Sequence, residues 1–162
     1  MTFKPSHASY HFVWKKEVPG LRERVNHFWA QNDRKPRADN IEKRLSELLM
    51  VATLGDEIVS VSSANLKPHI HENSIFAFYR VSVGTKFRQA GLSNMMLNLA
   101  WAHLTQWSID NPEKGLKGMA WVYENPVYDR RVIPQRPNGF ILTGYTQSKL
   151  PVYMKWFQHA EV

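Results

Sequence analysis

The sequence predicts one α/β domain over residues 1–162, organised around a mixed central sheet of about six to seven strands. Strand and helix patterns alternate along the chain without an internal repeat or a low-complexity segment. A chain of 162 residues suits a single domain that buries about 70% of the surface exposed by its unfolded state. Residues 92–107 form the most apolar helical pattern, which predicts a helix buried against the sheet.

The N-terminal segment predicts a strand followed by an amphipathic helix. Residues 10–14 are aromatic and β-branched, as is typical of a strand. Pro19 fits the first turn of a helix that continues to residue 29, because its ring fixes a helical φ. The apolar side chains of this helix share one face: Leu21, Val25, Phe28 and Trp29. We therefore expect the helix to pack this face against the sheet.

A second helix is expected after a polar loop. Residues 31–37 contain a proline and predict the loop, and Asp39 or Asn40 would cap the helix that follows. The apolar residues assigned to this helix are Ile41, Leu45, Leu48 and Leu49.

The middle of the chain predicts a β-hairpin and a core strand. Residues 51–54 and 58–66 flank Gly55-Asp56, a dipeptide typical of a tight turn between antiparallel strands. Residues 69–73 are polar and predict a turn. Residues 75–83 are apolar and aromatic, and they predict a strand in the core of the sheet.

The C-terminal half predicts the long helix and three further strands. The expected apolar stripe of the helix consists of Leu92, Met95, Met96, Leu99 and His103, widened by Leu97, Trp101 and Leu104. Residues 110–114 would end the helix, and residues 119–123 predict a strand. Residues 125–138 contain several prolines and predict irregular structure. Residues 140–146 and 151–157 would form two closing strands.

Residues 83–93 read Val-Gly-Thr-Lys-Phe-Arg-Gln-Ala-Gly-Leu-Ser and join the core strand to the long helix. A strand, a short basic turn and a helix start can bind phosphate, because the backbone N–H groups converge there. Gly91 leaves the backbone open to an anion, and Arg88 adds positive potential. A glycine at such a junction also commonly serves only to make the turn. The spacing fits neither a Walker A loop nor a dinucleotide fingerprint.

This segment resembles the acyl-CoA-binding motif of the GCN5-related N-acetyltransferase (GNAT) superfamily, which runs Val-x-Pro-x-aromatic-Arg-x-x-Gly-aliphatic-Gly/Ala. The matching positions are Val83, Phe87, Arg88, Gly91 and Leu92. Thr85 stands where proline is common, and Ser93 stands where the second small residue is usually Gly or Ala. The predicted order of elements is also similar to that of the superfamily over most of the chain.

The resemblance implies a single GNAT-like domain with helices on both faces of the sheet and a splay between the fourth and fifth strands. It implies acetyl-CoA, or another acyl-CoA, as the cofactor, with the pantetheine arm entering the splay. The implied pantetheine contacts are backbone groups of Val81, Ser82 and Val83. The implied pyrophosphate contacts are backbone groups of Arg88, Gln89, Ala90, Gly91, Leu92, Ser93 and Asn94. Asn125, after the fifth strand, is a further implied coenzyme contact.

Direct attack of an amine on a thioester needs an acceptor for the amine proton and an acid for the leaving thiolate. Glu124, at the end of the fifth predicted strand, is the first candidate base, because burial would raise the pKa of its carboxyl group. The alternative is an exposed carboxylate paired with Arg130. Tyr128 is the first candidate acid, although it comes earlier than the usual tyrosine of the superfamily. Its rivals are Tyr79, Tyr123 and Tyr145, for which aromatic packing is the alternative role.

Composition limits the classes of site and partner. A net charge of +7 would attract a CoA phosphate, a nucleic acid or an acidic protein. The absence of cysteine excludes disulfides, thiolate zinc sites and a cysteine acyl intermediate, and it fits a reducing, cytoplasmic compartment. No apolar run approaches the ~20 residues of a membrane span, so no membrane partner is expected. His69 and His71 would need a third metal ligand, for which Glu72 is the close carboxylate, and a surface turn without metal is predicted.

The sequence leaves three functions open. The first is an acyl-CoA-dependent N-acyltransferase that moves an acetyl group to the primary amine of a small molecule or a protein, with a homodimer left open. The second is a catalytically degenerate GNAT-like binding or inhibitor module, and the third is a small basic nucleic-acid-binding protein. Residues 15–24, 31–39 and 127–137 would line the acceptor site by analogy. Their basic residues, Arg130 and Arg131 among them, favour an acidic or carboxylate-bearing acceptor.

Overall fold

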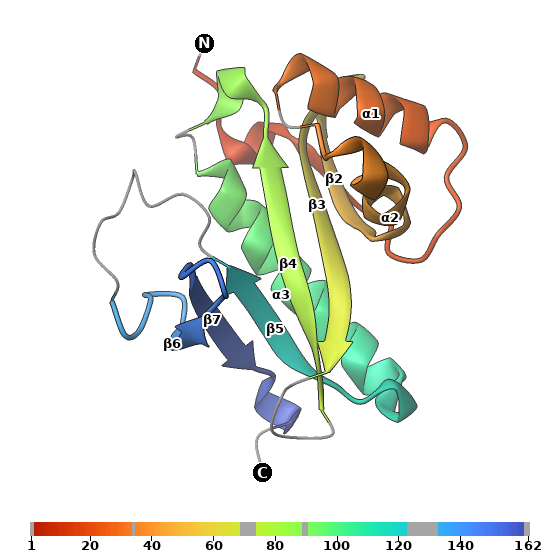
Figure 1. The fold of residues 1–162 in the computed structure, drawn as a ribbon. Helices are drawn as coiled ribbons and strands as arrows, with labels where there is room; N and C mark the ends of the chain where they lie inside the picture. Colours follow the sequence, from red (N-terminus) through yellow and green to blue (C-terminus); the bar gives the residue numbers. More distant parts are fainter. Residues whose placement is uncertain (1, 34, 69–73, 89–90, 123–132, 161–162) are drawn as a thin grey trace. The chain divides into compact units, whose positions relative to one another are not determined.

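The structure is a computed structural model that describes residues 2–33, 35–68, 74–88, 91–122 and 133–160 (Figure 1). The chain divides into two compact units. Unit 1 comprises Met1–Ala64 and Arg80–His103, and unit 2 comprises Asn65–Tyr79 and Leu104–Val162. The prediction of one domain over the whole chain stays a prediction.

Within the described residues, seven strands form a mixed sheet in the order β1-β2-β3-β4-β5-β7-β6, which confirms the predicted fold class. The strands are β1 (Ser9–Phe12), β2 (Leu48–Leu54), β3 (Glu57–Pro68), β4 (Ile75–Val83), β5 (Leu116–Val122), β6 (Ile141–Tyr145) and β7 (Pro151–Trp156). The α-helices are α1 (Leu21–Gln31), α2 (Ile41–Ser46) and α3 (Leu92–Asp110). The 3-10 turns are η1 (Pro5–His7), η2 (Ala38–Asn40), η3 (Thr85–Phe87), η4 (Pro112–Lys114) and η5 (Gln158–Ala160).

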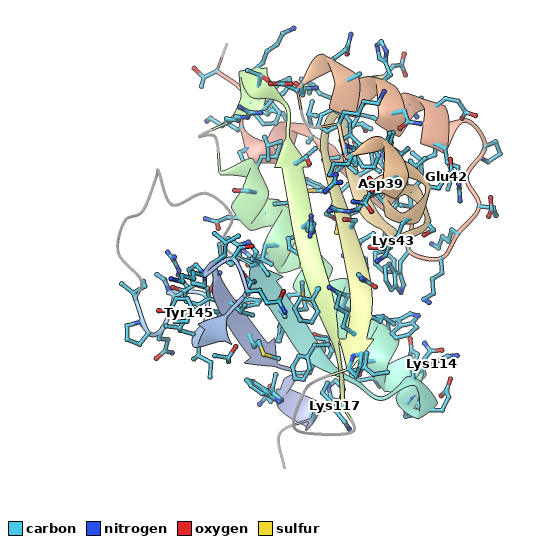
Figure 2. All side chains as sticks on the ribbon, viewed as in Figure 1. Asp39, Glu42, Lys43, Lys114, Lys117 and Tyr145 are labelled. Carbon is cyan, nitrogen blue, oxygen red and sulfur yellow. The ribbon has the colours of Figure 1, made fainter. Side chains whose placement is uncertain are left out.

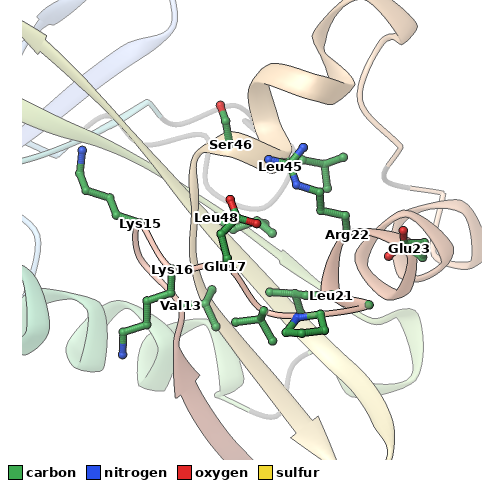
Figure 3. Close-up of a pocket in the computed structure, with 13 residues that line it drawn as sticks. Val13, Lys15, Lys16, Glu17, Leu21, Arg22, Glu23, Leu45, Ser46 and Leu48 are labelled. Carbon is green, nitrogen blue, oxygen red and sulfur yellow. The ribbon is translucent and has the colours of Figure 1, made fainter.

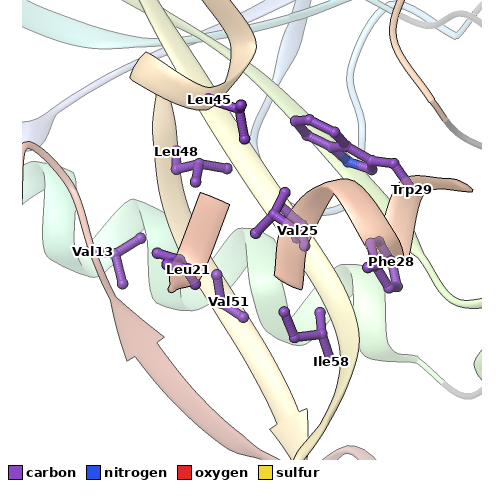
Figure 4. Close-up of a cluster of buried hydrophobic side chains, with 10 residues drawn as sticks. Val13, Leu21, Val25, Phe28, Trp29, Leu45, Leu48, Val51 and Ile58 are labelled. Atoms are coloured by element: carbon purple, nitrogen blue, oxygen red, sulfur yellow. The ribbon is translucent and has the colours of Figure 1, made fainter. Parts of the chain in front are cut away.

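Unit 1 is built on the antiparallel strands β1, β2 and β3. Figure 1 shows α1 and α2 over one face of β2 and β3, with the first turns of α3 on the other side. The predicted apolar face of α1 is confirmed, since all four of its residues are buried in one cluster with side chains of β2 and β3 (Figure 4). Burying each large apolar side chain of this cluster contributes roughly 1.5–3 kcal/mol.

The second helix is shorter than predicted. It ends at Ser46, and Leu48 and Leu49 belong to β2. Pairing with β3 begins at once, because the backbone N–H of Ala64 donates to the carbonyl oxygen of Glu47. The first six residues of β2 are all buried, so the strand shows no alternation of apolar and polar residues that would separate it from a helix. Asn40, one of the two predicted caps, occupies the N-cap position of α2, but its side chain makes no capping bond.

The long helix begins at Leu92 as predicted, but its apolar stripe differs at one position. Leu92, Met96 and Leu104 are buried, whereas His103 is exposed. The imidazole of His103 stacks on the ring of Phe12 in β1, with 4.4 Å between ring centroids. A flat polar ring can cover an aromatic ring at the edge of a core without being buried in it.

Unit 2 contains the parallel pairing of β4 with β5, followed by the antiparallel pairs of β5 with β7 and of β7 with β6. The two predicted closing strands are therefore confirmed. Phe76, Ala120 and Met154 form its buried cluster. Gly118 in β5 fits a close contact, because an added Cβ would collide with the backbone carbonyl oxygen of Lys155 and lie 2.9 Å from the ring of Phe76. Among the described residues, the last pair of β4 with β5 joins Tyr79 to Trp121.

Candidate functional site

The turn between β4 and α3 lies in unit 1, and backbone contacts fix its start. The N–H of Gly84 donates to the carbonyl oxygen of Val59 in β3 at 2.8 Å, and the N–H of Phe87 donates to the carbonyl oxygen of Gly84 at 2.9 Å. A Cβ at position 84 would lie 3.1 Å from the ring of Phe87 and 3.3 Å from the oxygen of Val59. The absence of a side chain at Gly84 therefore allows the turn to pack on β3.

Asn32 ties the end of α1 to this turn. Its side-chain NH₂ donates to the carbonyl oxygen of Phe28 at 2.8 Å, which satisfies the last turn of the helix. Its side-chain oxygen accepts the backbone N–H of Thr85 at 2.8 Å. The sequence analysis missed this residue. An asparagine just after a helical pattern is a signal for the first bond, but nothing local indicates the second.

The side chain of Arg88 contacts backbone groups on both sides of the turn. The guanidinium is exposed and donates from Nε to the carbonyl oxygen of Val83 at 3.3 Å and from Nη2 to that of Asn32 at 3.5 Å. These bonds join the end of β4 to the C-terminus of α1, where a positive charge is favourable. The side chain of Arg88 therefore braces the turn.

The N-terminus of α3 directs backbone N–H groups out of the helix. The N–H of Met95 donates to the carbonyl oxygen of Gly91 at 3.2 Å, and the N–H groups of Leu92, Ser93 and Asn94 come before it in the first turn, where the helix itself supplies no carbonyl oxygen. Gly91 has a left-handed φ of +80°, and the residues at 91, 93 and 94 are exposed. These features fit a pyrophosphate, which pairs well with backbone N–H groups at a helix N-terminus.

The N-terminal segment packs beside the same turn. The ring of Phe3 meets that of Phe87 edge to face, with 4.8 Å between centroids. Cγ of Pro5 would lie 3.8 Å from a Cβ placed on Gly91. Tyr10 in β1 holds this segment, because its hydroxyl donates to the carbonyl oxygen of Pro5 at 2.6 Å. Burial raises the pKa of Tyr10, which keeps the hydroxyl protonated and able to donate.

The last residues of β4, Val81, Ser82 and Val83, are half-buried. The carbonyl oxygen of Ser82 accepts a hydrogen bond from the hydroxyl of Ser60 at 2.9 Å. The role of these backbone groups in holding pantetheine stays a prediction.

A small cavity borders Ser82 on the side of α1 and α2. Its volume is about 40 Å³, and we call it the arginine cavity. Its lining consists of Trp29, Pro36, Arg44, Val61, Ser62, Ser63, Arg80 and Ser82, all from unit 1. The lining contains two arginines and no carboxylate.

A larger depression of about 450 Å³ lies at the other end of α1 (Figure 3). Its charged residues are mixed in sign, namely Lys15, Lys16, Glu17, Arg22 and Glu23. An 11-residue helix spans about 16 Å, so the start of α1 is distant from the turn that Asn32 contacts. Volume does not decide between the two ends, since a further depression of about 570 Å³ runs along α1 as far as Gln31. The bonded turn and the backbone N–H groups at the start of α3 favour the C-terminal end of α1, which we take as the candidate site.

Several predicted site residues lie outside the described part of the chain: Gln89, Ala90, Glu124, Asn125 and Tyr128, together with Tyr123, Arg130 and Arg131. Of the described rivals for the acid, Tyr79 is 3% exposed and Tyr145 is 57% exposed. The assignment of Glu124 and Tyr128 stays a prediction.

Charged side chains on the surface are distributed over both units, as the labelled Lys43, Lys114 and Lys117 illustrate (Figure 2). Within the described ranges, His, Asp and Glu residues form no group of three that could hold a metal ion. His69, His71 and Glu72 lie outside those ranges. None of the helices in the described part of the chain has the length and apolar character needed to cross a membrane.

Comparison with known proteins shows the fold. No protein-family profile and no curated protein matches the chain. A GNAT-family acetyltransferase from Streptococcus pneumoniae aligns over 92% of this chain and 99% of its own, at 10% identity and a TM-score of 0.57. The ribosomal-protein-S5-alanine acetyltransferase from Vibrio fischeri aligns over 100% and 98%, at 9% identity and a TM-score of 0.60. The protein yncA from Salmonella typhimurium, described with its cofactor acetyl-CoA, aligns over 96% and 97%, at 16% identity and a TM-score of 0.57. The chain therefore has the GNAT acetyltransferase fold, as the sequence predicted.

Proposed function

We propose that this protein is an acetyl-CoA-dependent N-acetyltransferase that acts on a primary amine by direct attack. The observation that carries the proposal is the turn before α3, where Gly91 takes a left-handed φ and the N–H groups of the first helical turn follow it. This arrangement supports anion binding at the place where the sequence resembles an acyl-CoA motif. The GNAT fold supports the same reading, and one protein of that fold is described with acetyl-CoA.

The proposed binding roles follow the sequence prediction. Backbone groups of Arg88, Gln89, Ala90, Gly91, Leu92, Ser93 and Asn94 bind the pyrophosphate. Backbone groups of Val81, Ser82 and Val83 bind the pantetheine arm, and Asn125 makes a further contact. Acetyl-CoA, when bound, supplies a thioester carbonyl that an amine can attack.

The proposed chemical roles belong to two residues. Glu124 accepts a proton from the attacking amine, and Tyr128 donates a proton to the departing thiolate. A general base works best when its pKa lies near the working pH. Burial raises the pKa of a carboxyl group towards that range.

The proposal is tested by titrating acetyl-CoA into the full-length protein in a calorimeter and by following thiol release with a panel of primary amines. We expect saturable heat and acceptor-dependent thiol release. Acetyl-pantetheine lacks the pyrophosphate and the 3′-phosphoadenosine, and it should bind at least tenfold more weakly if the helix N-terminus holds the phosphate end of the coenzyme. No heat at millimolar acetyl-CoA would reject the proposal.

A second candidate, a GNAT-like binding module without acetyl transfer, is favoured by two observations. The guanidinium of Arg88 is committed to the carbonyl oxygens of Val83 and Asn32, and Thr85 and Ser93 depart from the motif. Saturable binding of acetyl-CoA without thiol release on any amine of the panel would support this candidate over the enzyme.

A further inference from the structure

We propose that the arginine cavity binds a carboxylate of the acceptor, so that the substrate is an amine that also carries a carboxylate group. The inference rests on the proposed function and specifies the substrate class of the same site. Three features of the cavity support it, namely its position, its charge and its size.

The position of the cavity connects it to the proposed coenzyme segment. Ser82 borders the cavity and also belongs to the end of β4 that is proposed to hold pantetheine. The other walls come from α1 through Trp29, from the α1–α2 connection through Pro36, and from α2 through Arg44. A group held in the cavity therefore lies beside the end of β4.

The charge of the cavity favours an anion. Arg44 is half-buried and Arg80 is exposed, and both line the cavity. Two acidic residues near α2 pair with arginines outside the lining, Glu42 with Arg22 at 3.1 Å and Asp39 with Arg37 at 3.7 Å. A guanidinium binds a carboxylate through two parallel N–H bonds, which adds geometric selectivity to the charge.

The size and walls of the cavity favour a carboxylate over a larger anion. A volume of about 40 Å³ holds about three water molecules at 10–15 Å³ each, which matches the three heavy atoms of a carboxylate. Ser63 is 6% exposed and supplies a buried hydroxyl, and Trp29, 4% exposed, supplies an apolar wall. Apolar walls strengthen charge interactions by lowering the local dielectric constant.

Direct binding tests the cavity without the coenzyme. The Nε–H signals of the arginines in ¹⁵N-labelled full-length protein are followed by NMR during titration with sodium acetate, with acetamide and sodium chloride as matched additives. We expect the signals of Arg44 and Arg80 to shift and saturate with acetate alone, while that of Arg37, which does not line the cavity, stays constant. Equal shifts with chloride, or none with acetate, would overturn the proposal.

Turnover tests the substrate class. A series of amino acids from glycine to 6-aminohexanoate is compared with the corresponding amides. The series varies the distance between the amine and the carboxylate, which the structure does not fix. We expect kcat/KM of the acid to exceed that of its amide about tenfold or more for at least one chain length. Arg44→Gln and Arg80→Gln should lower this acid-to-amide ratio about tenfold, since each removes a charged hydrogen bond.

Two matched variants separate charge, shape and folding. Arg44→Lys keeps the positive charge but lacks the planar guanidinium that can make two parallel bonds. Its acid-to-amide ratio should therefore lie between those of the wild type and Arg44→Gln. Arg37→Gln removes an exposed charge outside the cavity and should leave the ratio unchanged. Loss of folded protein, checked by the thermal unfolding midpoint, lowers turnover of acid and amide alike and leaves their ratio unchanged. An unchanged ratio in both Arg44→Gln and Arg80→Gln would overturn the proposal.

The outcomes distinguish this inference from the proposed function. Loss of acetyl-CoA binding in the wild-type protein contradicts the proposed function, while the NMR titration still decides the cavity. Acetyl-CoA binding with equal turnover of acids and amides supports the proposed function and overturns the carboxylate subsite.

Discussion

The two ends of α1 differ in how they are held. At the C-terminal end, Asn32 bonds to Phe28 and Thr85, and Arg88 bonds back to Asn32 and Val83. At the N-terminal end, Gly20 makes no side-chain cap, and exposed side chains of both signs border a depression of about 450 Å³. In the first region, side-chain bonds to backbone groups join α1 to the turn. In the second, the hydroxyl of Ser46 bonds to Lys43 within α2, and Arg22 pairs with the exposed Glu42. The difference indicates that preorganisation, rather than volume, locates a binding site.

The largest expected effect is on acetyl-CoA binding when a carboxylate is placed in the turn. Gly91→Asp should raise the Kd of acetyl-CoA about 100-fold, or about 2.7 kcal/mol, because its charge opposes the pyrophosphate. Gly55→Asp is a matched control, since Gly55 also has a positive φ, +61°, and lies in the turn between β2 and β3. Calorimetry measures both. Equal weakening in the two variants would mean that the turn before α3 does not bind the coenzyme.

An intermediate effect is expected at Asn32. Asn32→Ala should destabilise the protein by about 2 kcal/mol, because it removes the bonds to Phe28 and Thr85. Asn111→Ala is the control, since Asn111 closes α3 with the same bond to the carbonyl oxygen four residues earlier, at 2.9 Å, and should cost about 1 kcal/mol. Urea unfolding gives both values.

The pair also tests the link to the turn. Only Asn32→Ala should weaken acetyl-CoA binding, because only Asn32 contacts Thr85. A similar loss of affinity in Asn111→Ala would show that the effect reflects general destabilisation.

The smallest effect is expected in the depression at the other end of α1. Glu17 is exposed and lines it, so Glu17→Ala should change the free energy of unfolding by less than about 0.5 kcal/mol. The Kd of acetyl-CoA should stay constant in the same calorimetric titration. A marked rise in Kd would move the candidate site to the depression and reverse the comparison.

Much of the fold could be predicted from local patterns. The bounds of β4 and the start of α3 agree with the sequence analysis, because a short apolar run and a long apolar helix flank a clear turn signal. The boundary after α2 was wrong because Leu48 and Leu49 lie in a strand buried on both faces, where strand and helix patterns look alike.

The site was harder to predict than the fold. The bond from Thr85 to Asn32 joins residues 53 positions apart, so no local spacing reveals it. The brace formed by Arg88 depends on the same approach of α1 to the turn. Arg44 and Arg80 meet at one cavity only because a helix lies on the sheet. Such long-range pairs follow from topology rather than from sequence periodicity.

Gly118 has a consequence for how β5 can pair. At that position a carbonyl oxygen of β7 occupies the space in which any other amino acid would carry its first side-chain carbon. Sliding β5 by one residue along β7 would bring Lys117 or Met119 to this point, and both would collide with the neighbouring backbone. Gly118 therefore disfavours pairings in which β5 is shifted by one residue along β7, and it helps to select the observed register of the two strands.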